Sequence, residues 1–311
     1  MTRKKQITTT VARRLVKGDT VGIAAPAGPF KREVFKRGIG VLAELGYRVY
    51  IPNGLFTQEA YLAGNDRHRA ELLNALFADP AIKGIWCARG GFGSMRLLPY
   101  LDYGIIQQNP KILIGFSDVT ALLVHLYTHC GLVTFHGPLV TSLADSTKKS
   151  LAALRHALSS EECILLTATG RQAVLKPGKA AGPVIGGNLT TLCHLLKTPF
   201  EPNLAGHILF LEDTDEASYR IDRMLSQMKM AGCFDELAGI ALGSFRHCGA
   251  AEAIRRIFKE MFSDLPIPIL QGFQFGHVRT NLTLPVGLNA VLDTDEGTLR
   301  YKVPATKEAI E

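Results

Sequence analysis

Three polar residues, each at the end of an expected strand, could together carry out nucleophilic chemistry. Ser117 follows a short apolar run and precedes a helix-like stretch, Glu212 ends a buried run, and His277 comes soon after a third run. A serine hydroxyl is a poor nucleophile at neutral pH unless a base takes its proton, and imidazole suits that role. A carboxylate can hold the imidazole in one tautomer and stabilise the imidazolium. These residues are therefore a candidate triad.

Each of the three residues also has a purely structural interpretation, which the pattern leaves open. Serine is among the preferred N-cap residues, so Ser117 could simply cap the helix that follows it. Glu212 belongs to an acidic cluster with Asp213, Asp215 and Glu216, and His277 is one of nine histidines. The position of Ser117 nevertheless favours function, because a sharp turn between a strand and a helix exposes a side chain and points the first free helix amides toward it.

The first half of the chain alternates expected strands with expected helices. Strands are expected over residues 20–25, 47–51, 84–87, 112–115 and 132–135, and helices over 32–45, 67–78 and 119–129. This order is typical of a mostly parallel sheet that helices cover on both faces. Function in such folds gathers at the carboxyl ends of the strands. Ser117 and the glycine-rich loop 89–94 both lie at such ends.

The length of 311 residues suits two domains. A stretch rich in glycine, lysine, alanine and threonine lies beyond residue 166 and is typical of a linker. We expect an N-terminal α/β domain over 1–160, a linker over 161–180 and a C-terminal α/β domain over 181–311. In the latter, strands are expected over 207–211 and 240–245, a helix over 219–230 and a hairpin over 284–303.

Composition narrows the class of protein. The formal charge of +7 is concentrated in the first seventeen residues, and no nucleic-acid motif follows, so a small anionic substrate is the simpler expectation. The six cysteines have no paired spacing, which predicts neither a zinc site nor a disulfide framework. No signal core or membrane span is recognisable. We expect a cytoplasmic protein that needs no metal and no cofactor and binds neither nucleic acid nor membrane.

Eight ordered segments carry a resemblance to a known family. They are Ala25-Pro26-Ala27-Gly28, Arg89-Gly90-Gly91-Phe92-Gly93, Gly115-Phe116-Ser117-Asp118, His136-Gly137-Pro138, Gly186-Gly187-Asn188-Leu189, Leu211-Glu212-Asp213, Tyr219-Arg220-Ile221-Asp222-Arg223 and Gly276-His277. In order and spacing they resemble the LD-carboxypeptidases, or muramoyltetrapeptide carboxypeptidases, a family that also includes the microcin C self-immunity peptidases. The resemblance extends from about Gly18 to Val303.

The resemblance implies a fold and a set of site residues. The fold is a Rossmann-like N-terminal domain with a mostly parallel sheet, a C-terminal domain of mixed α/β structure, and an active site between them, in a homodimer. Ser117 is implied as the nucleophile, His277 as general base and then acid, and Glu212 as the carboxylate that orients it. The backbone amides of Gly91 and Asp118 are implied as the oxyanion hole.

The implied reaction is acyl transfer on a small peptide. A serine LD-carboxypeptidase of this kind releases the terminal D-alanine of a muropeptide tetrapeptide, which would place the protein in peptidoglycan recycling. The enzyme must also bind a free carboxylate. Arg89, beside the glycine-rich loop, is a candidate for that role, although an ion pair that braces the loop explains it equally well.

Other functions are compatible with parts of the sequence. A microcin C-type self-immunity peptidase belongs to the same family. A nucleotide-binding α/β module could use loop 89–94, but that loop lacks the lysine of a Walker loop and the G-x-G-x-x-G spacing. Cys87 also ends a strand and could be the nucleophile of a thiol hydrolase. An α/β-hydrolase would need G-x-S-x-G, which is absent around Ser117.

Overall fold

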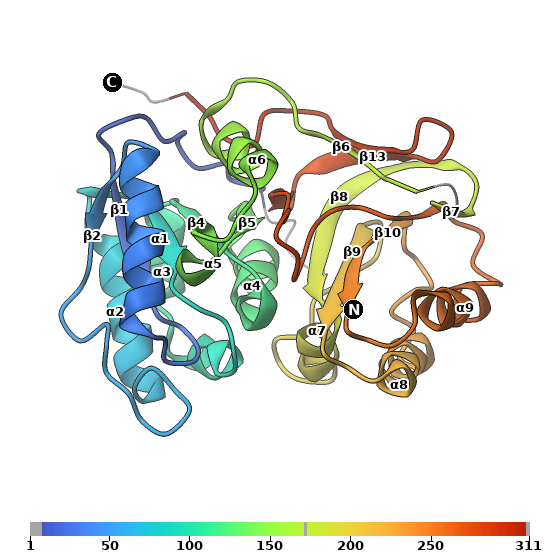
Figure 1. The fold of residues 1–311 in the computed structure, drawn as a ribbon, viewed down its shortest axis with the longest axis horizontal. Helices are drawn as coiled ribbons and strands as arrows, with labels where there is room; N and C mark the ends of the chain where they lie inside the picture. The colour runs from blue at the N-terminus through green and yellow to red at the C-terminus, as the bar shows by residue number, and fades with distance from the viewer. Residues whose placement is uncertain (1–7, 171–172, 309–311) are drawn as a thin grey trace.

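Two sheets lie side by side in the computed structural model, which describes residues 8–170 and 173–308 (Figure 1). The first has six strands in the order β12-β5-β4-β3-β1-β2. Their bounds are β1 Thr20–Ala24, β2 Arg48–Tyr50, β3 Ile82–Cys87, β4 Ile112–Gly115, β5 Thr134–His136 and β12 Leu284–Val286. Strands β1 to β5 are parallel and β12 is antiparallel to β5, which confirms the mostly parallel sheet.

Helices cover both faces of this sheet. They are α1 Arg32–Glu44, α2 Asp66–Ala78, α3 Tyr103–Gln108, α4 Thr120–Cys130 and α5 Val140–Leu143, with the 3₁₀ helices η1 Ser94–Tyr100 and η2 Ser117–Val119. The middle strand β3 shows why both faces need cover. Ile85 and Cys87 pack into the core that contains side chains of α2 and α4, whereas Trp86 between them packs into the core that contains those of α1. Successive side chains of a strand point to opposite faces, so a strand buried on both sides is apolar throughout.

The second sheet has eight strands in the order β6-β14-β13-β8-β9-β10-β11-β7. Their bounds are β6 Leu165–Thr167, β7 Val174–Lys176, β8 Lys179–Asn188, β9 Ile208–Thr214, β10 Gly239–Arg246, β11 Ile269–Gln271, β13 Asn289–Asp293 and β14 Thr298–Tyr301. Strands β8 to β11 run parallel and the outer strands run antiparallel to their neighbours, so this half is mixed. Helices α6 Lys148–Ser159, α7 Leu189–Leu195, α8 Ser218–Met230 and α9 Ala251–Met261 complete the fold.

Two segments differ from what their composition suggested. Residues 161–180, expected as a linker, carry β6 and β7, which pair with β14 and β11 respectively. The expected hairpin is formed by β13 and β14, but residues 284–286 are not part of it. They cross to the first sheet as β12 and pair with β5. The C-terminal half therefore supplies an edge strand to the N-terminal sheet and ties the two halves together.

Helix α4 lies at the boundary between the two halves, where it contacts α7 and β8 (Figure 1). One apolar core runs across that boundary, from side chains of α1 to those of β9 and β10. Within residues 8–170 and 173–308, no helix is long and apolar enough to cross a membrane. This shared core matters for the site, because the expected triad residues come from both halves.

Two buried histidines should make the folded protein sensitive to acid. Burial lowers the pKa of His125 from 6.5 to about 4, with a further contribution from His129, and burial likewise lowers that of His136 to about 4. The unfolded chain therefore binds more protons than the folded one below pH 6.5, so stability is complete above that pH and falls as the pH drops toward 4. At pH 5 each histidine should cost about 2 kcal/mol.

Urea unfolding at pH 7 and pH 5 measures this loss. The matched variant is His125→Phe, because His125 already packs edge-on against Phe200 and a phenyl ring keeps an aromatic side chain there. We expect the variant to lose about 2 kcal/mol less than the unsubstituted protein between the two pH values. An equal loss in both proteins would show that His125 does not titrate on unfolding in this range.

Candidate active site

The turn that carries Ser117 is sharp and strained. Strand β4 ends at Gly115, where a Cβ atom would lie 2.7 Å from the Val119 side chain, so no larger residue fits without a shift. Ser117 has φ of 64°, in the left-handed region that non-glycine residues rarely occupy. Such strain persists where the surrounding structure enforces it, and it clusters at functional sites. The N-cap position of η2 is Phe116, so the helix-cap interpretation of Ser117 is wrong.

The three expected residues meet in one line of hydrogen bonds. His277 Nε2 is 3.1 Å from Ser117 Oγ, and His277 Nδ1 is 2.7 Å from Glu212 Oε2. An ionised carboxylate only accepts, so Nδ1 carries the proton and Nε2 is free to accept the proton of the hydroxyl. Glu212 is wholly buried, whereas Ser117 and His277 are partly exposed beside a cleft. The arrangement can therefore deprotonate a nucleophilic hydroxyl.

Gly276 allows the imidazole and the carboxylate to approach this closely. Its φ is 98°, and a Cβ atom there would lie 2.4 Å from Glu212 Oε2. The next residue, His277, also donates its backbone N–H to the same carboxylate oxygen, at 3.2 Å. Glu212 Oε2 therefore fixes both the backbone and the ring of His277. A side chain at Gly276 would displace that oxygen.

The environment favours the protonated form of His277. Burial lowers its pKa, but the hydrogen bond to Glu212 and the negative charges of Glu212, Asp213 and Asp215 outweigh burial, so the pKa is raised above 6.5. A base whose conjugate acid titrates near neutral pH is well matched to proton transfer at that pH. The carboxylates thus support the imidazolium that forms when Ser117 gives up its proton.

Other members of the acidic cluster have different partners. Asp213 is buried and accepts from Asn188 Nδ2 at 2.9 Å and from the backbone and hydroxyl of Thr190 at 2.9 and 2.8 Å. It therefore braces the first turn of α7. Glu216 pairs with Arg220 one helical turn along. Glu212 is accordingly the member of the cluster that hydrogen-bonds to His277.

The glycine-rich loop lies against Ser117. A Cβ atom on Gly90 would be 3.0 Å from Ser117 Cβ and 3.1 Å from its Oγ, so the loop backbone passes at van der Waals distance. Asp118 ties the two segments together, because its Oδ2 accepts from Ser94 N at 2.8 Å. Gly91, expected as an oxyanion donor with Asp118, has φ of 107° in this loop. The loop that resembled a phosphate cradle is thus part of the serine site.

Two residues singled out from the sequence do not join this arrangement. Arg89 donates to the carbonyl oxygen of Pro29 and lines a neighbouring cavity of about 420 Å³ with Lys31. It braces its loop there and does not line the cleft that holds His277. Cys87 is wholly buried, and burial raises the pKa of its thiol far above the usual value. A thiol in that state is inert, so Cys87 is not a nucleophile.

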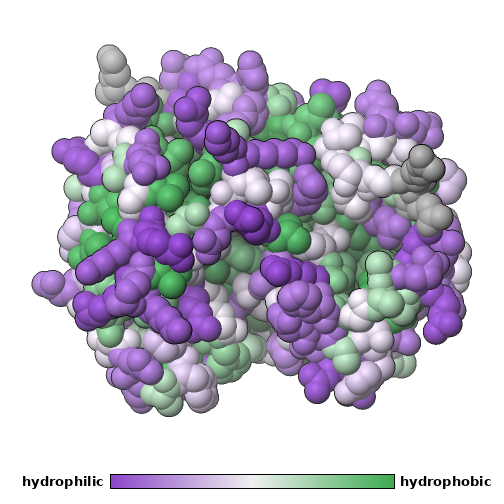
Figure 2. Space-filling model, in the orientation of Figure 1, coloured by the Kyte–Doolittle hydropathy of each residue, from purple (hydrophilic) through white to green (hydrophobic). Residues whose placement is uncertain are grey.

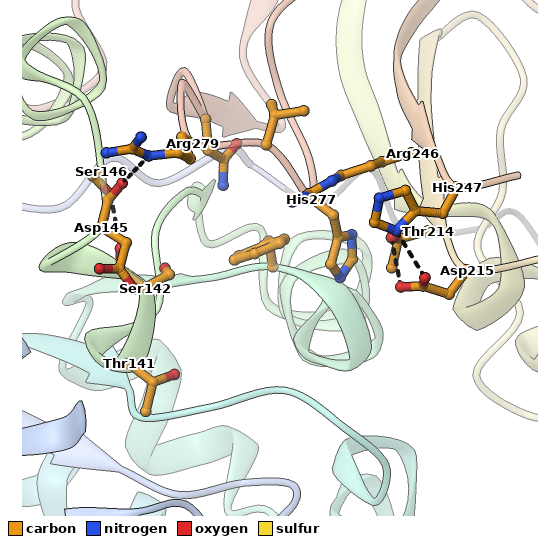
Figure 3. A pocket seen from close by; sticks show the side chains of 13 residues that line it. Thr141, Ser142, Asp145, Ser146, Thr214, Asp215, Arg246, His247, His277 and Arg279 are labelled. Carbon is orange, nitrogen blue, oxygen red and sulfur yellow. Dashed lines mark hydrogen bonds and ion pairs between the residues drawn. The ribbon is translucent and has the colours of Figure 1, made fainter. Parts of the chain in front are cut away.

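A cleft of about 430 Å³ opens beside His277 and receives side chains from both halves (Figure 3). Its lining residues are Phe116, Thr141, Ser142, Asp145, Ser146, Thr214, Asp215, Arg246, His247, His277, Val278, Arg279 and Asn281. Hydrophilic side chains gather on this face along the boundary between the two sheets (Figure 2). Of the charged residues among them, His277 and Asp215, a member of the acidic cluster, were singled out from the sequence as candidates, and the others were not. Arg246 and His247 directly follow the expected strand 240–245, and that position is the signal that could have indicated them.

Comparison with known proteins identifies the family. Residues 21–137 match the LD-carboxypeptidase N-terminal domain, and residues 181–292 match the LD-carboxypeptidase C-terminal domain. The "Probable murein peptide carboxypeptidase" of Bacillus subtilis (strain 168) is 35% identical over 305 residues, which cover 96% of this chain and 96% of that protein. The microcin C7 self-immunity protein MccF of Escherichia coli is 33% identical over an alignment of 324 residues, gaps included, that covers 92% of this chain and 93% of that protein.

Solved structures show the same two-part architecture. An MccF-like protein from Bacillus anthracis str. Ames has a TM-score of 0.89 and 27% identity, covering 95% of this chain and 100% of its own. The muramoyltetrapeptide carboxypeptidase from Oxalobacter formigenes has a TM-score of 0.82 and 29% identity, covering 94% of this chain and 100% of its own. The two-domain α/β fold implied by the sequence resemblance is thereby confirmed. The chain belongs to the LD-carboxypeptidase family and is a serine-type carboxypeptidase, a hydrolase.

Proposed function

We propose that this enzyme releases the terminal D-alanine from murein tetrapeptides, and that Ser117, His277 and Glu212 form its catalytic triad. The observation that carries the proposal is the continuous line of hydrogen bonds from Ser117 Oγ through His277 to the buried Glu212. The name of the Bacillus subtilis relative supports a murein peptide as the substrate. We further propose that the enzyme acts in the recycling of such peptides, in the cytoplasm and as a homodimer. Light scattering of the purified protein tests the dimer.

The proposed mechanism passes through an acyl-enzyme. Ser117 Oγ attacks the carbonyl carbon of the residue before D-alanine while His277 Nε2 takes the hydroxyl proton. The backbone amides of Gly91 and Asp118 hold the oxyanion, and each such donor contributes about 3 kcal/mol to the transition state. His277 then gives its proton to the leaving amine of D-alanine. A water molecule activated by the same imidazole hydrolyses the ester and frees Ser117.

Mass spectrometry of murein tetrapeptides incubated with the protein tests this function. We expect each tetrapeptide to lose one alanine and nothing else, and free D-alanine to appear in equal amount. A tetrapeptide that remains intact, or one that is cut at another bond, contradicts the proposal. Replacement of the terminal D-alanine by L-alanine is the matched control for the stereochemistry of the cleaved bond.

A second candidate is a self-immunity peptidase of the MccF type. The observation in its favour is the backbone, which superposes on the MccF-like structure with a TM-score of 0.89, against 0.82 for the muramoyltetrapeptide carboxypeptidase. One solved MccF structure is a complex with aspartyl sulfamoyl adenosine, which makes that compound a suitable probe. Hydrolysis of this probe with a higher kcat/KM than that of the tetrapeptide would favour the second candidate.

We expect the reaction to need no metal ion. The proposed triad supplies nucleophile, base and orienting carboxylate by itself. Within the described ranges, no group of three or more His, Cys, Asp or Glu side chains is placed to hold a metal. Activity should therefore survive EDTA and dialysis, while a serine-directed reagent should label Ser117. Recovery of lost activity on addition of zinc would contradict this expectation.

The pH profile should report the raised pKa of His277. The imidazole must be neutral to accept a proton, so the acidic limb of kcat/KM follows its deprotonation in the free enzyme and should lie above pH 6.5. Glu212→Gln removes a negative charge that raises this pKa, so the limb should move to lower pH. The pH dependence of kcat/KM for the residual activity of the variant measures the shift of the acidic limb. A limb at the same pH in both proteins would show that a group other than His277 controls it.

A further inference from the structure

Two acidic residues, Asp145 and Asp215, line the cleft, and the Asp215 carboxylate is hydrogen-bonded to two neighbours at the rim. Asp215 accepts from Thr214 Oγ1 at 2.9 Å and from His247 Nδ1 at 3.0 Å (Figure 3). These bonds lower the pKa of Asp215, so it remains a carboxylate at neutral pH. The Asp215 carboxylate therefore already has hydrogen-bond partners from β9 and from the segment after β10.

The backbone at this rim is strained. Asp215 has φ of 59° and His247 has φ of 57°, both in the left-handed region. Ser117, which hydrogen-bonds to His277, has φ of 64°, so three of the five described non-glycine residues with positive φ lie at or beside the triad and this rim. Residues are kept in this region when the structure around them enforces it, and such strain clusters at ligand sites. Both members of the strained pair adjoin the backbone of Arg246, which precedes His247 in the chain and whose carbonyl oxygen accepts from Asp215 N.

Arg246 presents a free cation to the cleft. It is the last residue of β10, opposite Thr214 of β9, and its carbonyl accepts from Asp215 N at 2.9 Å. The side chain extends from the end of β10 toward His277 (Figure 3). In the part of the chain that the structure describes, this guanidinium makes no hydrogen bond or ion pair, whereas the Asp215 carboxylate is bonded to Thr214 and His247.

The other arginine of the cleft is turned aside. Arg279 donates from Nε to the carbonyl oxygen of Asp145 at 3.0 Å, and Figure 3 shows it directed away from His277. Asp145, the second acidic residue of the lining, pairs with Arg37 at 3.5 Å. Each carboxylate of the cleft thus has a partner, Arg37 for Asp145 and His247 for Asp215. Of the two arginines that line the cleft, Arg246 is the one whose side chain makes no hydrogen bond or ion pair within the described residues.

We propose that Arg246 binds a carboxylate of the substrate and determines the specificity of this site, an inference that rests on the proposed function. A guanidinium matches a carboxylate with two parallel N–H···O bonds, and a planar cation directed into a cleft is suited to that geometry. This assigns to Arg246 the role that the sequence suggested for Arg89. A murein tetrapeptide offers two such groups next to the cleaved bond, its terminal carboxylate and the side-chain carboxylate of meso-diaminopimelate, which lysine lacks; the α-carboxylate of its γ-linked D-glutamate lies one residue further away.

Binding measurements on four peptides test the assignment without relying on turnover. Tetrapeptides with meso-diaminopimelate or L-lysine at the third position, each ending in a carboxylate or a carboxamide, are titrated calorimetrically into the Ser117→Ala protein. The same titrations follow with Arg246→Gln added. Loss of the carboxylate that Arg246 binds should weaken binding by about 10- to 100-fold with Arg246 present, and by less than about threefold with glutamine there.

The two sources of carboxylate give different patterns. If Arg246 binds the terminal carboxylate, the Arg246→Gln protein should lose its preference for peptides that end in a carboxylate over those that end in a carboxamide. If Arg246 binds the side-chain carboxylate, that protein should lose its preference for diaminopimelate over lysine. Arg246→Lys should retain only part of the preference, because an ammonium lacks the planar fork. Arg256→Gln is the matched control, since Arg256 pairs with Glu260 on the exposed face of α9. It should leave all four affinities unchanged.

Several results would overturn the inference. An equal change on all four peptides would mean that Arg246 binds neither of the two carboxylates that are varied. No change, or an equivalent pattern produced by Arg89→Gln instead, would place the carboxylate elsewhere. Failure of all four peptides to bind would exclude a murein peptide as the ligand of Arg246. A protein that binds with the expected Arg246 dependence, yet does not release D-alanine when Ser117 is present, would uphold this inference and refute the proposed function.

Discussion

Replacement of Ser117 by alanine should abolish peptide hydrolysis and leave the fold intact. The hydroxyl hydrogen-bonds to His277 at 3.1 Å and belongs to a partly exposed residue, so its removal takes away the proposed nucleophile without creating a buried cavity. Loss of the nucleophile from a triad costs about 10⁶-fold in kcat, because the remaining members cannot act without it. Alanine should also tolerate the positive φ of this turn about as well as serine does.

Two measurements test this expectation. Single-turnover hydrolysis of a tetrapeptide gives the rate, and thermal unfolding shows whether the variant is still folded. Activity above about a hundredth of that of the unsubstituted enzyme would rule out Ser117 as the nucleophile, given the size of the effect in other triads. Cys87→Ser is the matched control, and it should remain active because the thiol is buried away from the cleft.

Local sequence patterns predicted the elements that position the site. Helix α1 was expected over 32–45 and spans Arg32–Glu44, and β4 was expected over 112–115 and spans the same residues. Apolar strands that end in glycine or a polar residue are local signals, so they can be recognised without knowledge of the fold. The placement of Ser117 at a carboxyl strand end followed from that pattern. Its catalytic role rests on the resemblance and stays a prediction.

Contacts between distant segments could not be predicted in the same way. Strand β12 pairs with β5 across some 150 residues of chain, and nothing in its short apolar sequence indicates which sheet it joins. The bond between Asp215 and His247 is equally non-local, because it joins the segments that follow β9 and β10. Whether two such segments meet is decided by the pairing of their strands and not by the residues of either one.

Glu212→Gln should lower kcat/KM by about 10⁴-fold, the scale found when the carboxylate of a serine protease triad is made an amide. The glutamine side chain has the same shape, so the packing around this wholly buried position is kept. Its amide can donate to His277 Nδ1, which favours the tautomer whose Nε2 carries a proton and cannot accept from Ser117. The imidazolium also loses the negative charge that stabilises it.

A double substitution shows whether Glu212 acts through His277. His277→Ala alone should cost about as much as Ser117→Ala, since the hydroxyl then has no base. If the carboxylate acts only by orienting and supporting the imidazole, the combination of Glu212→Gln with His277→Ala should be little worse than His277→Ala alone. The hydrogen bonds predict this result, because Glu212 Oε2 contacts the ring and the backbone of His277. Multiplicative losses would instead mean that the two residues act independently, and Asp215, whose charge also raises the pKa of His277, would become the orienting carboxylate to test.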